Sequence, residues 1–199
     1  MEPDHPDFTD ELIAGRRAGP PGQMPADMPP WMAWLIHWID TASRIAGRII
    51  CWLLVPLMGA MVYEVVARKL FIAPTDWAYD ISRMLCGAMF MLGAGYALSK
   101  GVHIRADFLY RNWPVRRQGM VDAGLYVLLY FPAILFFGWV SYDYAAVAWE
   151  RGERSMDTAW MAPLAPVRTA MPVGAALLLV QGVSELLKSV YAARTNRWP

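Results

Sequence analysis

Long uncharged apolar runs separated by short polar segments form the main pattern along the chain. The runs cover residues 49–63, most of 77–98, 123–142 and most of 158–184. A hydrocarbon core of about 30 Å requires roughly 20 mainly apolar residues in a helix. The pattern therefore predicts an all-α membrane protein. We expect its four transmembrane helices at about 45–66, 77–98, 121–143 and 165–187, within a membrane domain that covers 31–199.

Proline and arginine modify two of these predicted helices. Pro56 removes a backbone donor from the first and crowds the preceding turn, so we expect a kink there. In the fourth run, Pro163 and Pro166 precede Val167, near which we expect the regular helix to begin. An arginine at a bilayer centre costs about 2.5 to 3.5 kcal/mol on insertion scales. Arg168 should therefore lie near an interface or face a partner.

The segment 31–48 has an amphipathic pattern. Its apolar residues recur at helical spacing, and the opposite side carries the charges. A Trp-rich face backed by cations is typical of a helix that lies in the membrane interface or leads obliquely into it. Asp40 and Arg44 are four residues apart with the acid first, which favours an ion pair. The apolar members are Trp31, Trp34, Leu35, Trp38, Ala42 and Ile45.

Residues 1–30 differ from the rest of the chain in composition. They contain seven prolines, six acidic residues and little apolar material. A segment of this kind cannot bury a core, so we expect a disordered, Pro-rich acidic tail. It also lacks the charged start and apolar centre of a cleavable signal peptide.

The second predicted helix has two unlike sides when its residues are placed at 100° intervals. One side is apolar and suits lipid, whereas the far side combines two charges with small residues. In lipid, small residues and polar contacts drive helix association. This helix should therefore contact protein over more than half of its circumference. The expected lipid side comprises Ile81, Leu85, Ala88, Leu92 and Tyr96. The far side comprises Asp80, Arg83, Gly87, Met91 and Ala94.

Composition excludes several classes of protein. The 199 residues are 57% hydrophobic and include ten Trp, which is too apolar for an ordinary soluble domain, and a net charge of +1 provides no nucleic-acid-binding field. Cys51 and Cys86 lie inside apolar runs without disulfide or metal spacing. The three histidines fall outside the predicted spans, so no helix carries the axial ligands of a haem. With neither a nucleophile–base pair in the spans nor a Walker-type loop, we expect no enzyme and no cofactor.

The distribution of cations predicts an orientation. Glu185 and Lys188 begin what we interpret as a short basic tail after the fourth span. Ten cations then fall on the side of this tail and four on the other, so the positive-inside rule predicts that both termini and the central loop are cytoplasmic. The ten are Arg44, Arg48, Lys100, Arg105, Arg111, Arg116, Arg117, Lys188, Arg194 and Arg197. The four are Arg68, Lys69, Arg151 and Arg154.

Short motifs follow one another in a fixed order over residues 63–107. Arg68 closes the first span, and a connection with Pro74 leads to Trp77 and Asp80 at the start of the second. A Gly- and Ala-rich span then precedes a G-x-H-[VI]-x-x-D motif. This order resembles the small membrane subunit, of the DctQ type, of tripartite ATP-independent periplasmic (TRAP) transporters, although Glu is commoner there at the position of Asp80. The last motif is formed by Gly101, His103, Ile104 and Asp107.

The resemblance implies a role without catalysis in a bacterial inner membrane. In this family a soluble periplasmic protein captures a solute, usually an organic acid, and delivers it to two membrane subunits. The large subunit contains the solute and sodium sites, and the small one packs against it as a fixed scaffold. An ion gradient drives uptake. A stand-alone small channel, or a membrane anchor that recruits a soluble partner through the acidic tail, remains the alternative, and an intramembrane enzyme ranks third.

Two groups of residues are candidate sites under this hypothesis. In the first group, Asp80, Arg83 and the side with Gly87 and Ala94 contact the large subunit, or they pack within this subunit against Glu64 and Arg68. A purely internal ion pair between Asp80 and Arg83 is the further alternative. The second is the loop motif, in which a hydrogen bond of His103 that fixes the loop is favoured over pH sensing. The first group is Glu64, Arg68, Trp77, Asp80, Arg83, Gly87 and Ala94. The second is Gly101, His103, Arg105 and Asp107.

Overall fold

The computed structural model describes residues 28–100 and 113–196, and within these ranges its regular structure is helical. Four helical stretches are long and apolar enough to cross a membrane, which confirms the predicted fold class. They are Pro30–Leu70, Trp77–Ser99, Val115–Arg151 and Ala165–Thr195. The individual elements are α2 (Pro30–Cys51), α3 (Leu54–Leu70), α4 (Trp77–Ser99), α6 (Val115–Leu125), η1 (Tyr126–Tyr130), α7 (Phe131–Arg151) and α8 (Ala165–Thr195).

The first stretch is interrupted just before Pro56, in the turn that its ring crowds. A proline ring crowds the carbonyl four residues earlier, here that of Trp52. Helix α2 ends at Cys51, and α3 begins at Leu54. The Trp52 carbonyl accepts a hydrogen bond from the Val55 amide at 3.2 Å, three residues on, so the turn between α2 and α3 is tighter than an α-helical one.

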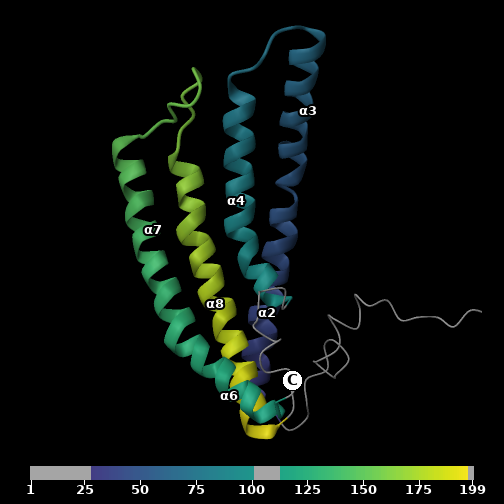
Figure 1. The fold of residues 1–199 in the computed structure, drawn as a ribbon, viewed down its shortest axis with the longest axis vertical. Coiled ribbons are helices and arrows are strands. Elements are labelled where there is room, and N and C mark those ends of the chain that lie inside the picture. The colour runs from purple at the N-terminus through teal and green to yellow at the C-terminus, as the bar shows by residue number, and fades with distance from the viewer. Residues whose placement is uncertain (1–27, 101–112, 197–199) are drawn as a thin grey trace, which may run out of the picture.

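The third stretch contains a different irregularity. Residues Tyr126–Tyr130 form one turn of π-helix between α6 and α7, and Pro132 follows one residue further on, in the first turn of α7. A π-turn widens the helix by one residue and accommodates the missing proline donor. The Tyr130 hydroxyl donates to the Leu178 carbonyl of α8 at 2.8 Å, which ties this turn to its neighbour. The result is a long helix whose α6 end crosses the end of α8 (Figure 1).

The four spans form a curved row (Figure 1). Its order is α7, α8, α4 and α3, because the main packing contacts join α7 to α8, α8 to α4 and α4 to α3. Helix α2 packs on α4 and α8, and α6 packs on α8. We call the end with the connections 71–76 and 152–164 the connector end. The end where α2 begins and α8 finishes is the terminal end.

Helix α8 is the centre of this row and approaches its neighbours closely. A Cβ atom on Gly174 would lie 2.5 Å from the Met91 carbonyl oxygen of α4. A Cβ on Gly119 of α6 would lie 2.7 Å from the Ser189 carbonyl oxygen of α8. Only glycine fits such backbone contacts, which small residues typically provide between membrane helices.

The predicted lipid side of α4 is wrong at Tyr96. Gly47 of α2 lies against this tyrosine, and a Cβ there would come within 2.4 Å of the ring. Gly95 meets Leu177 of α8, and Leu98 is buried. Because α4 stands between α3 and α8 and also supports α2, the side expected to face lipid is partly covered by protein.

Candidate functional site

Five of the seven predicted interface residues, Glu64, Arg68, Trp77, Asp80 and Arg83, lie at or near the connector end, and Gly87 and Ala94 lie further along α4. Glu64 holds the connection between α3 and α4. Arg68 donates to one Glu64 oxygen through Nε at 3.0 Å and Nη2 at 2.5 Å. The Thr75 amide and hydroxyl donate to the other oxygen, the amide at 3.0 Å. Nearby, Trp77 packs on Tyr63 with ring centroids 5.4 Å apart. These contacts fix the start of α4 relative to the end of α3.

Asp80 is fully buried within the chain, and its partners come from the connection before α8. The Ser155 hydroxyl donates to Oδ1 at 3.2 Å, and the Thr158 hydroxyl donates to Oδ2 at 2.5 Å. The guanidinium of Arg83 lies 3.6 Å away, so the internal pair named as an alternative is present. The Asp80 side chain is 0% exposed, so its contacts in this structure are with residues of its own chain.

Arg83 links this buried carboxylate to the surface. Its Nη1 lies 2.5 Å from Asp157, and its Nη2 donates to Ser155 at 3.3 Å. The guanidinium also lies 5.9 Å from the ring centroid of Tyr79. The network therefore ties α4 to the segment 155–158 and leaves Arg83 half-exposed at its edge.

Beyond Arg83, α4 presents an open strip with small residues. Cys86 and Gly87 are exposed, and nothing lies within 4 Å of where a Gly87 Cβ would be. Phe90 follows at 74% exposure, whereas Ala94 is half-buried. Of the predicted interface, the part near Gly87 is thus accessible to another membrane helix.

A second polar cluster, at the terminal end, was not predicted. Its centre is Lys188 of α8, whose ammonium lies 2.7 Å from Asp40 of α2 and 2.9 Å from Glu185. Asp40 also accepts from Gln181 and Ser184, both at 2.8 Å. We call these five residues the α2–α8 lock.

The lock corrects two sequence predictions. Arg44 does not pair with the carboxylate of Asp40 but donates to its backbone carbonyl at 3.2 Å and to Thr41 at 3.0 Å. Glu185 and Lys188 are buried in α8 and do not start an exposed tail. The signal was present in the sequence, because the polar residues of α8 recur at helical spacing at positions 181, 184, 185, 188 and 189.

Arg168 is neutralised within the chain. Its guanidinium forms an ion pair with Glu153 and stacks 3.9 Å from the ring centroid of Tyr144. The pair joins α8 to the segment that follows α7. This resolves the alternatives for Arg168: it lies at the connector end and binds an acidic residue of its own chain.

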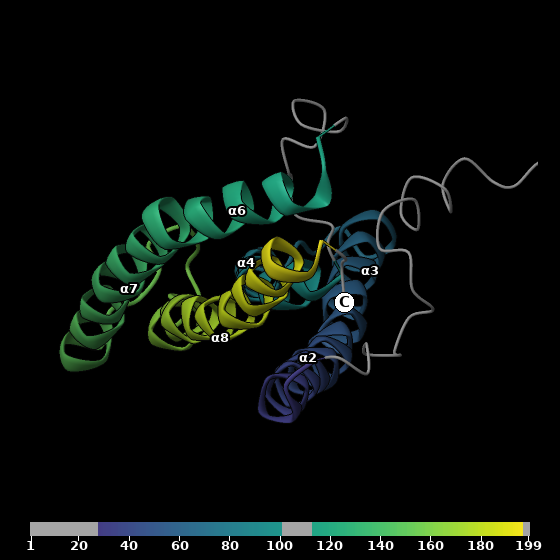
Figure 2. The ribbon, with the colours of Figure 1, turned by 90° about the horizontal axis from the view of Figure 1, so that it is seen from below.

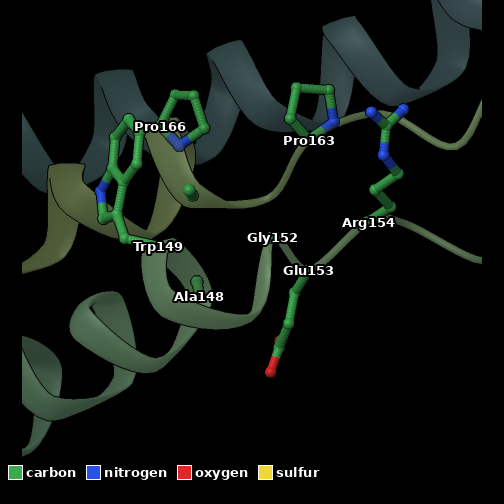
Figure 3. Close-up of a pocket in the computed structure, with 8 residues that line it drawn as sticks. Ala148, Trp149, Gly152, Glu153, Arg154, Pro163 and Pro166 are labelled. Carbon is green, nitrogen blue, oxygen red and sulfur yellow. The ribbon is translucent and has the colours of Figure 1, made fainter.

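A shallow hollow of about 200 Å³ lies beside this pair (Figure 3). Its walls are mostly apolar, with Trp149 and Pro166 at one end and Arg154 at the other. Glu153 points away from the prolines (Figure 3). A solute site needs several converging polar groups, and this hollow does not provide them.

The loop motif falls outside the described residues. Gly101, His103, Arg105 and Asp107 belong to 101–112, so their predicted roles stay predictions. Among the residues that the structure describes, no group of three His, Cys, Asp or Glu is arranged to hold a metal ion.

The fold and its polar contacts define a multi-pass membrane protein in which buried charges join helices of the same chain. The chain belongs to the family of tripartite ATP-independent periplasmic transporters, DctQ component, whose model matches residues 57–191. It is thus a small membrane subunit of a TRAP transporter, since the members of this family are transporter components. The family implies a large membrane subunit, DctM, and a periplasmic binding protein as partners. No curated protein and no solved structure matches the chain.

Proposed function

We propose that this chain is the fixed scaffold of its transporter and binds the large subunit through the open strip of α4. The observation that carries the proposal is the contrast between the two parts of that helix. Near the connector end, Asp80 and Arg83 bind residues of their own chain. Next to them, Cys86 and Gly87 are exposed and offer a shallow surface to a second helix.

The remaining roles follow from the family. A periplasmic binding protein would deliver a solute, an organic acid by family resemblance, and the large subunit would move it with an ion gradient. A scaffold needs helices that do not shift against each other, and the contacts of Asp80 and the α2–α8 lock provide such connections. Both termini would be cytoplasmic, as the cation distribution predicts.

Substitution of Gly87 by leucine tests the interface. Gly87→Leu fills the open strip, so co-purification of the large subunit in mild detergent should fall severalfold, while the isolated chain keeps its unfolding temperature. Gly124→Leu is the matched control, because nothing lies within 4 Å of a Cβ there either, and it belongs to the third span. Undiminished recovery of the large subunit with Gly87→Leu would refute the proposed interface.

A further inference from the structure

The outer face of α2 is a continuous apolar strip that no described part of the chain covers. Trp31, Trp34 and Trp38 are 61%, 62% and 58% exposed, and the strip continues to Ile45 and Ile49. The opposite face packs on α4 and α8. Tryptophan on such a face is typical of the headgroup level of a membrane, where its ring is apolar and its N–H is solvated.

The position of this strip along the molecule can be measured on the helices. Lys100 follows Asp80 by 20 residues on α4, and Arg44 precedes Glu64 by 20 residues on α2 and α3. At 1.5 Å per residue each interval is about 30 Å, the thickness of a hydrocarbon core. If the carboxylates mark one boundary, Arg44 and Lys100 mark the other, and the three tryptophans lie beyond it.

Exposed cations from both segments lie near the contact of α2 with α4. Gly47 lies against Tyr96, and the Lys100 ammonium is 5.8 Å from the centroid of that ring. Arg44 and Arg48 flank Gly47 in the sequence, and both are exposed. The hydrogen bonds of Arg44 to Thr41 and to the Asp40 carbonyl hold its side chain along the helix surface.

We infer that Arg44, Arg48 and Lys100 bind the phosphate of an anionic phospholipid, with the tryptophan strip of α2 seated among neighbouring headgroups. Charge complementarity selects this occupant, because three cations at a boundary attract a headgroup with net negative charge. A zwitterionic headgroup carries no net charge, so the three cations attract it much less strongly. Helix α2 runs obliquely when the molecule is viewed along its length, which suits a helix that leaves the hydrocarbon region (Figure 2). The inference rests on the proposed cytoplasmic orientation of this end, where anionic lipid attracts basic segments.

The test measures lipid retention by the purified transporter complex. Native mass spectrometry counts phosphatidylglycerol bound after titration in mild detergent, with phosphatidylcholine and inorganic phosphate as separate arms. The test variant is Arg44→Gln/Arg48→Gln/Lys100→Gln. The matched control is Lys69→Gln/Arg151→Gln/Arg154→Gln, which removes the same charge from exposed residues at the connector end. If the triple variant does not fold, Arg48→Gln alone serves, because it changes one exposed side chain.

The unmodified complex should retain phosphatidylglycerol in preference to phosphatidylcholine. The test variant should lose roughly fivefold in apparent affinity per cation removed, and the control should lose none. Equal binding of the two lipids, unchanged retention by the test variant, or displacement of the lipid by inorganic phosphate would overturn the site. The site would also be overturned if the test variant lost the large subunit while the number of bound lipids stayed constant. The large subunit, and not a lipid, would then cover the outer face of α2. Recovery of the large subunit with Gly87→Leu is measured separately, so failure of the scaffold proposal can be distinguished from failure of the lipid site.

Discussion

Replacement of Lys188 by methionine removes the cation of the α2–α8 lock while keeping the length of the side chain. Lys188 is 9% exposed and Glu185 is completely buried. After the change, the carboxylates of Asp40 and Glu185 face each other across an apolar side chain. Gln181 and Ser184 still donate to Asp40, but neither side chain carries the positive charge of the lysine ammonium.

The size of the effect follows from this burial. Removing one partner of a buried ion pair costs about 3 to 5 kcal/mol, because a charge is left uncompensated. The Asp40 side chain is 23% exposed, so water relieves part of its charge and the lower value applies, about 3 kcal/mol. For a chain of this length, the unfolding temperature should fall by about 6 to 12 °C.

The assay is a double-mutant cycle with Lys188→Met, Asp40→Asn and the pair combined. Each protein is heated in detergent, and the loss of its monodisperse chromatographic peak gives the unfolding temperature. The combined variant should be more stable than the sum of the single losses predicts, with a coupling of about 0.5 to 3 kcal/mol. Hydrogen exchange in α2 should rise in Lys188→Met. Lys69→Met, at an exposed position of α3, is the control. Strict additivity, or an unfolding temperature equal to that of the control, would refute the lock.

Three further changes test other parts of the structure. Gly174→Leu should separate α8 from α4 and cost at least 1 to 3 kcal/mol in thermal unfolding, whereas Gly59→Leu, with open space around it, should be nearly neutral. Equal losses would contradict the close contact. Arg168→Met should lower the unfolding temperature by several degrees, because its acidic partner is left unpaired; an unchanged temperature would argue against the pair. In a cysteine-free chain, an impermeant maleimide should label Met156→Cys from outside intact cells and Arg116→Cys only after lysis; the reverse would invert the orientation.

The sequence was most informative about features that depend only on residues close together in the chain. The run lengths predicted four spans, and Pro56 predicted an interruption that falls four residues earlier, at the carbonyl its ring crowds. The order of motifs from Arg68 to Asp107 predicted the family, which the family match confirms. Each of these signals lies within a few neighbouring residues.

The polar partners could not be read in the same way. Asp40 has an arginine four residues on, yet its carboxylate binds Lys188, which is 148 residues away. Asp80 likewise binds Ser155 and Thr158 across the connector end. Helical spacing shows which side chains share a face, but only the packing of α2 and α4 on α8 determines which of them meet.

The arrangement of the spans in a row bears on where an ion or solute could pass. A closed ring of helices surrounds an interior through which an ion or solute could pass, but a row of spans has two outer sides and encloses no such interior. The described helices are joined as α7, α8, α4 and α3. If this subunit borders an aqueous passage, as the scaffold proposal allows, the passage would run along one side of the row and another polypeptide would complete its wall.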